Sequence, residues 1–144
     1  MSAKTVCVEA VMGGKFKLTS TIGKHTLHVD QPEMAGGTGA GPTPLEYFLL
    51  SLAGCISTIG RIVANQKKIP LRSMVLKVQG ELDTDVLLGK NNISRAGFSP
   101  LNVRVDIDAD LTHEEKEAFL KEVELRCPIS DNILNATPLE IVVS

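Results

Sequence analysis

The N-terminal part of the chain alternates apolar and polar residues in short runs, which predicts β-strands. Glycine-containing pairs, Gly13-Gly14 and Gly23-Lys24, separate these runs and are typical of hairpin turns. We therefore expect an antiparallel meander with strands over 5–11, 15–20 and 25–29. Segment 34–44 follows, with four Gly and two Pro, and is predicted to be a loop.

A long helix is predicted after this loop. Apolar residues recur at helical spacing from Leu45 to Val63, and the pattern extends to about Lys68. Further apolar side chains occupy the other faces, so this helix must be buried on most sides. A chain of this size rarely supplies that much cover, and a second copy of the protein is the expected source of the rest.

The C-terminal part is predicted to hold two longer strands and two helices. Segments 72–83 and 101–109 have the period of strands, with a long loop or short helical insert between them. Thr112 and Glu115 form a capping-box signature at the start of a helix over 113–126.

Pro128 is predicted to begin a further short helix, because Pro is favoured at the first helical position. A last strand is expected over 139–143. The order of elements contains no βαβ repeat, so the sequence indicates an α+β fold, with one domain over residues 1–144.

Composition and charge exclude several classes of partner. The net charge is −2, and one Tyr, four Phe and no Trp leave little for bases to stack on, so nucleic acid is not expected as a partner. The longest uncharged apolar window, 47–60, is shorter than the roughly 20 residues that a bilayer requires. The N-terminus lacks a signal-peptide pattern, which predicts a cytoplasmic protein without a membrane partner.

Three cysteines are the candidates for chemistry. Their odd number and the lack of a C-x-x-C pair argue against a disulfide framework, and the three His do not complete a metal site, so no metal or cofactor is expected. Cys7 is predicted to be structural, in the first strand. Cys55 is either a small core residue of the long helix or a reactive thiol. Cys127 either closes a helix end or is activated by the helix N-terminus and by Arg126.

Two motifs resemble the OsmC/Ohr family (osmotically inducible protein C and organic hydroperoxide resistance). The segment Gly41-Pro-Thr-Pro-Leu-Glu46 with Ala53-Gly54-Cys55 is similar to the family's central helix, and Arg126-Cys127-Pro128-Ile129-Ser130 with Leu134 is similar to its second cysteine motif. The resemblance implies an OsmC-like fold, with antiparallel sheets around a buried central helix in an intertwined homodimer.

The same resemblance implies reduction of organic hydroperoxides through a cysteine pair. Cys55 would be the nucleophile and Cys127 its disulfide partner, with a dithiol as reductant. The family's peroxidases also hold the nucleophile as thiolate with an Arg and a carboxylate. The carboxylate position corresponds to Leu45, so Glu46 is the candidate one residue later, and residues 1–60 contain no Arg.

Two functions therefore stay open at this point. The first is a cysteine-based hydroperoxide reductase in oxidative-stress defence. In this case we expect the activation of Cys55 to need a cation from outside its own helix, supplied across the dimer interface. The second is an OsmC-like protein that binds a small apolar ligand or responds to oxidation without efficient turnover.

Overall fold

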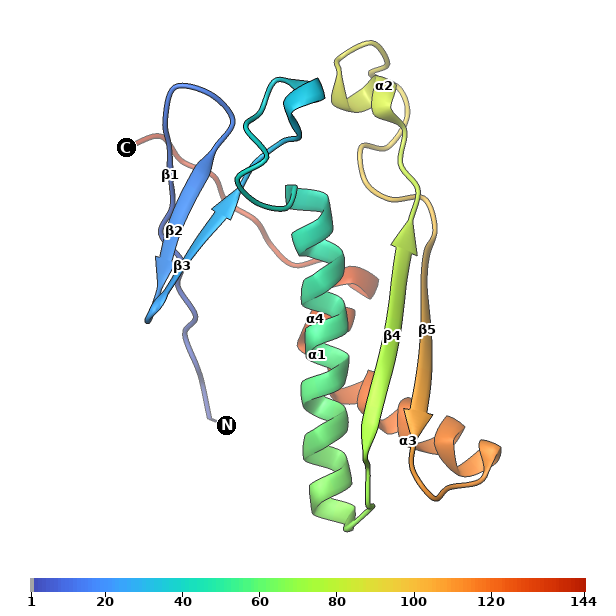
Figure 1. Cartoon of the computed structure of the whole chain (residues 1–144). Helices are drawn as coiled ribbons and strands as arrows, with labels where there is room; N and C mark the ends of the chain where they lie inside the picture. The colour runs from blue at the N-terminus through green and yellow to red at the C-terminus, as the bar shows by residue number, and fades with distance from the viewer. Residues whose placement is uncertain (1) are drawn as a thin grey trace. The chain divides into compact units, whose positions relative to one another are not determined.

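The computed structural model describes residues 2–144, whose contacts divide the chain into two compact units. The first unit ends at Phe48 and the second is Leu49–Ser144. Helix α1 (Pro44–Lys67) begins in the first unit and continues through the second (Figure 1). The first unit holds a three-stranded sheet and the second a two-stranded one, so the α+β class with antiparallel pairing is confirmed.

The sheet of the first unit is the predicted meander. Strands β1 (Val11–Met12), β2 (Leu18–Ile22) and β3 (His25–Val29) pair antiparallel in sequence order. Gly23 turns the chain between β2 and β3 with φ of 61°, which favours glycine. The third strand has its predicted bounds, and the second lies nearer Ile22 than expected.

The first strand is much shorter than predicted. Only Val11 and Met12 pair with β2, and residues 5–10 form no regular element. Val6 and Val8 are 78% and 59% exposed, although their alternation is that of a strand. A strand needs a partner edge, and within residues 2–144 this segment has none.

A buried carboxylate organises the loop after β3, which includes the short 3-10 helix η1 (Glu33–Ala35). Asp30 is 1% exposed and accepts hydrogen bonds from the N–H groups of Gln31, Thr38 and Ala40 and from the Thr38 hydroxyl. A Cβ on Gly37 would lie 2.0 Å from the Gln31 carbonyl oxygen, so only glycine permits this close approach. The glycine-rich loop is therefore a fixed structure.

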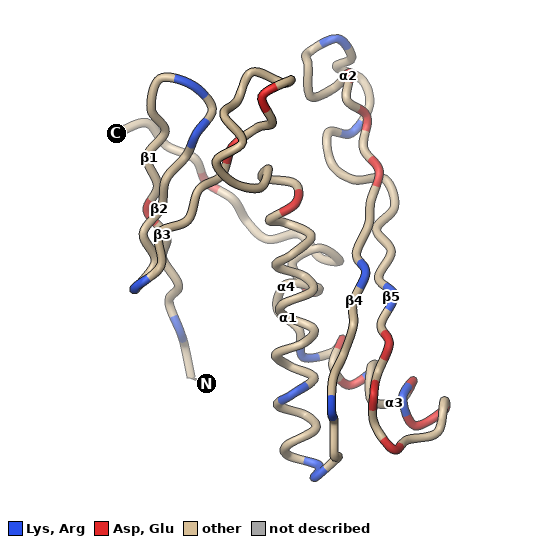
Figure 2. Tube along the Cα trace, viewed as in Figure 1, with Lys and Arg blue, Asp and Glu red and all other residues tan. Residues whose placement is uncertain are grey.

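In the second unit, β4 (Ser73–Gly80) and β5 (Leu101–Asp108) pair antiparallel along their whole length. The short helix α2 (Thr84–Leu87) lies in their connection, as the predicted helical insert. Helix α3 (His113–Arg126) begins at the predicted capping box, and α4 (Pro128–Leu134) begins at the predicted proline. Acidic residues gather along α3 (Figure 2), as expected for a solvated face.

The core of the second unit lies between α1, the β4–β5 ribbon and α3. Alternate residues of β4 turn toward it, and α3 contributes Phe119 and Val123. Gly60 lets α1 pack closely against β4, because a Cβ there would lie 2.9 Å from the Met74 sulfur. The buried apolar residues are Leu52, Ile56, Val63, Ala64, Leu71, Ile107, Ala109, Phe119, Val123 and Cys127.

Two sequence expectations are not met by the single chain. The buried residues of α1 are few, and Leu50 is 61% exposed, so this helix is not covered on most sides. The last strand, 139–143, is also absent, and residues 136–144 form no helix or strand. Leu139, Ile141 and Val143 are 83%, 85% and 100% exposed, because no strand edge within residues 2–144 pairs with this segment.

By length and composition, α1 is also apolar enough to cross a membrane. The uncharged window 47–60 underestimated the length of this apolar helix. Arg61 ends the window, but the apolar pattern continues beyond it. One face of α1 nevertheless lies in the protein core, and core helices commonly pass the same test.

The Asp30 network predicts a specific loss of stability in acid. Its hydrogen bonds, that of the Thr38 hydroxyl above all, lower the pKa of Asp30 from 3.8 to about 2. The ionised carboxylate therefore stabilises the fold above about pH 4, and this contribution is lost as the pH falls to about 2. Asp30→Asn should be less stable at neutral pH and lose less stability over this range, as measured by thermal unfolding against pH.

The matched control is Asp106→Asn, which removes an exposed carboxylate of β5. Its acid profile should follow that of the unmodified chain. An Asp30→Asn variant with the stability and acid profile of the unmodified chain would contradict the role given to Asp30.

Candidate functional site

The structure brings two of the three cysteines into contact. Cys55 lies on α1 and Cys127 between α3 and α4, and their sulfurs are 2.9 Å apart although 72 positions separate them in the sequence. Both are free thiols, since a disulfide bond is about 2.05 Å long. Figure 1 shows α4 beside α1 at this point.

Cys127 is positioned by the junction between two helices. It is the C-cap of α3 and the N-cap of α4, with extended backbone at φ −84° and ψ 109°. Pro128 occupies the first turn of α4, and the Cys127 sulfur accepts the Ser130 N–H at 3.4 Å. The predicted N-cap position of Cys127 is therefore confirmed, and its side chain is 1% exposed.

Cys55 reaches the same helix end from α1. Its sulfur accepts the backbone N–H of Ile129, and its side chain is half-buried. Burial raises the pKa of the Cys55 thiol, and so do the hydrogen bond and the charge of Cys127; the Ile129 N–H acts in the opposite direction. An ordinary thiol, with a pKa of about 8.5, is already only a few per cent thiolate at neutral pH. Within this single chain, Cys55 is therefore mostly a protonated thiol at neutral pH.

The arginines nearest in sequence are bonded elsewhere. Arg126 donates to the Gln66 side chain at 2.9 Å and lies 3.7 Å from the Glu122 carboxylate. Arg61 donates to the Leu71 carbonyl oxygen at 2.7 Å. The expectation that Arg126 activates Cys127 followed from sequence adjacency, and the observed guanidinium bonds α1 and α3 instead.

Glu46 has a structural role at the start of α1. Its carboxylate accepts both the N–H and the hydroxyl of Thr43 at 2.9 Å, and the Glu46 N–H is donated to the Thr43 hydroxyl oxygen. These bonds, led by the Thr43 N–H, lower the pKa of Glu46. Thr43 and Glu46 have the spacing of a capping box, a signal that the sequence analysis missed here.

The remaining cysteine does not join the site. Cys7 is exposed in the segment before β1 and lies in no strand of the single chain, so its structural role stays a prediction. Within residues 2–144, no group of three or more His, Cys, Asp and Glu side chains is placed to hold a metal ion. The candidate site is therefore the pair of thiols at the N-terminus of α4.

Removing Cys127 should make Cys55 more acidic. The neighbouring thiol raises the pKa of Cys55 through a hydrogen bond and through its charge, so Cys127→Ala removes both effects. The rate of Cys55 alkylation, followed by mass spectrometry of its peptide, should then reach half of its maximum at a lower pH. The control is Cys7→Ala, which should leave this profile unchanged; an equal or higher midpoint in Cys127→Ala would contradict the assignment.

Comparison with known proteins shows the family to which this chain belongs. The sequence profile described as OsmC-like protein matches residues 37–142, which include both cysteines. Among curated proteins, none matches the chain. Solved structures share its fold, among them an OsmC-like protein from Mycoplasma pneumoniae with a TM-score of 0.80 and 22% identity, covering 94% of this chain and 91% of that one.

Two further structures are described as organic hydroperoxide resistance proteins. One, from Legionella pneumophila, is also described as a predicted redox protein; it has 25% identity and a TM-score of 0.64, covering 92% of this chain and 91% of that one. The other, OhrB of Bacillus subtilis, has 22% identity and a TM-score of 0.60, with 92% and 93% covered. The chain belongs to the family of OsmC-like proteins, as its two cysteine motifs indicated.

Proposed function

We propose that this protein reduces organic hydroperoxides with Cys55 and Cys127. The observation that carries this proposal is the 2.9 Å contact between the two sulfurs, which can become a disulfide with little movement of the chain. The family and the relatives described as hydroperoxide resistance proteins support the substrate class.

The reaction would proceed in three steps. The Cys55 thiolate attacks the terminal oxygen of the hydroperoxide, the O–O bond breaks, and the alkoxide leaves and takes up a proton as an alcohol. Cys55 is now a sulfenic acid, and the Cys127 sulfur displaces its hydroxyl group as water to form the disulfide. An external dithiol then reduces this disulfide and is itself oxidised.

Accessibility supports Cys55 as the residue that meets the peroxide. Cys127 is 1% exposed, whereas Cys55 is half-buried on the surface of α1. Leu52 and Ile56, its neighbours on α1, belong to the apolar core, so the surroundings of Cys55 suit an alkyl chain. We assign Glu46 no step, because its Oε1 atom accepts both the N–H and the hydroxyl of Thr43 at the start of α1.

A homodimer is part of the proposal. The exposed face of α1 includes Leu50 and Ile62, which are 61% and 38% exposed, and the segments at both ends of the chain expose alternating apolar residues without a strand partner. A second copy would cover these surfaces and add strand pairing. It would also supply the cation that Cys55 needs, since Arg61 and Arg126 are bonded elsewhere.

The second candidate function is a redox-responsive or ligand-binding protein without efficient turnover. The raised pKa of Cys55 favours it, because a thiol that is rarely ionised reacts slowly with peroxide. The two functions differ in rate, since both allow the same thiols to be oxidised.

A steady-state assay separates them. With an alkyl hydroperoxide and a dithiol reductant, we expect catalytic turnover that Cys55→Ser abolishes, because the attacking sulfur is lost. Without the dithiol, Cys127→Ser should consume about one equivalent of peroxide and leave Cys55 as a sulfenic acid in place of the disulfide. Cys7→Ser is the matched control and should keep full activity; peroxide consumption no faster than the dithiol alone gives would favour the second function.

The dimer is tested by sedimentation. At micromolar concentration the protein should have a mass of about 31 kDa, twice the chain mass of 15.5 kDa. Leu50→Glu places a charge on the exposed face of α1 and should shift the equilibrium toward the monomer. Glu124→Gln on the exposed side of α3 is the control, and a monomeric wild-type protein would contradict the dimer.

A further inference from the structure

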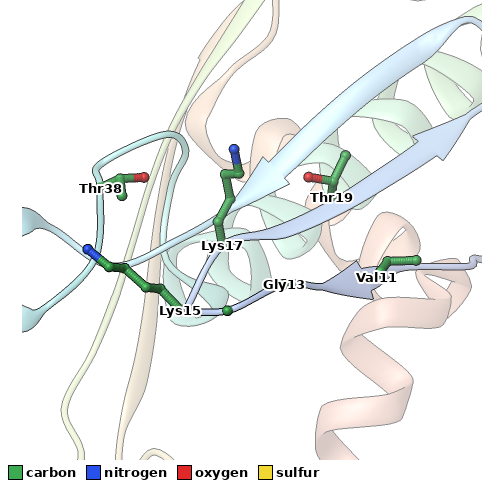
Figure 3. A pocket seen from close by; sticks show the side chains of 7 residues that line it. Val11, Gly13, Lys15, Lys17, Thr19 and Thr38 are labelled. Carbon is green, nitrogen blue, oxygen red and sulfur yellow. The ribbon is translucent and has the colours of Figure 1, made fainter.

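The first unit contains a pocket that the thiol chemistry does not use. It has a volume of about 420 Å³ and lies between the β1–β2 turn and the glycine-rich loop. Its walls include Lys15 and Lys17 from the turn, Thr19 from β2 and Thr38 from the loop. In Figure 3, Lys15 extends toward the loop that carries Thr38, and Lys17 stands between Thr38 and Thr19.

The side chains that line this pocket carry positive charge and no negative charge. Neither Lys15 nor Lys17 forms an ion pair with any side chain of residues 2–144, and no residue of the lining is acidic. Between Glu9 and Asp30 the sequence holds three lysines and no acidic residue, and the β1–β2 turn is blue in Figure 2. Asp30 itself is buried and bonded to the loop. The two lysines would therefore attract an anion here, and the Asp30 carboxylate behind Thr38 would oppose part of that attraction.

Both walls of the pocket are held in place. Thr38 is fixed by its N–H and its hydroxyl, which both donate to Asp30, at 3.2 and 2.6 Å. The tip of the turn contacts the loop, since a Cβ on Gly36 would lie 3.1 Å from the Phe16 ring. Thr19 is bonded to His28 Nδ1 of β3 at 3.1 Å. The backbone of both walls is thus held, and the two lysine side chains are the parts that a ligand would order.

We infer that this pocket binds the oxyanion group, carboxylate or phosphate, of a small molecule. The two ammonium groups supply charge-assisted hydrogen bonds, which are the stronger kind. The stems of the lysines and Val11 add apolar surface for the rest of the ligand. This inference does not rest on the proposed function, because every residue that it uses lies in the first unit and none is a thiol.

The test follows the backbone amide signals of the full chain while inorganic phosphate or acetate is added at constant ionic strength. We expect saturable shifts confined to residues 13–19 and 36–40. Saturation by phosphate identifies a phosphorylated ligand and saturation by acetate a carboxylate. The double variant Lys15→Gln/Lys17→Gln should bind at least about tenfold more weakly, since it loses both charged donors.

The matched control is Lys4→Gln/Lys24→Gln, which removes the same charge from the same unit outside the pocket and should keep the affinity. Unsaturable shifts with both anions would overturn the inference, as would equal weakening in the two double variants. The amide spectrum without added anion checks that each variant is folded. Loss of peroxide turnover in Cys55→Ser would leave these titrations unchanged.

Discussion

The junction between α3 and α4 determines where the second thiol lies. Helix α3 ends at Arg126, Pro128 begins α4, and Cys127 must adopt extended backbone between them. This conformation directs the Cys127 sulfur to the first N–H groups of α4, where the sulfur of Cys55 also lies. The contact between the two thiols thus depends on one residue that ends one helix and begins the next.

The short distance between the two thiols favours a disulfide but lowers the reactivity of Cys55. Contact allows a disulfide to form, but the neighbouring thiol and the burial both raise the pKa of Cys55. One helix N–H, from Ile129, acts against them. The arginines closest in sequence hold α1 against other elements of the second unit. Efficient turnover therefore calls for a positive charge from beyond this chain's own thiol site, and a second copy of the protein is the source that we propose.

Sequence alone predicted the elements that depend on local signals. The capping box at Thr112 and Glu115, the proline at 128 and the alternation in β4 and β5 each act within a few residues, and each appears in the structure. The N-cap position of Cys127 followed from the same kind of signal. What sequence could not provide was the direction of a long side chain, as for Arg126. It also could not provide a partner edge for residues 5–10 and 139–143. Their apolar residues alternate as in strands, but no strand edge within residues 2–144 pairs with them.

The most direct test of this account is the product of one oxidation. The reduced protein is treated with one equivalent of an alkyl hydroperoxide, blocked by alkylation, and mapped by mass spectrometry without reduction. The account predicts that the peptides of Cys55 and Cys127 are joined, that Cys7 is alkylated, and that the hydroperoxide has become the alcohol. A main crosslink that contains Cys7, or consumed peroxide with Cys55 and Cys127 both still free, would contradict it.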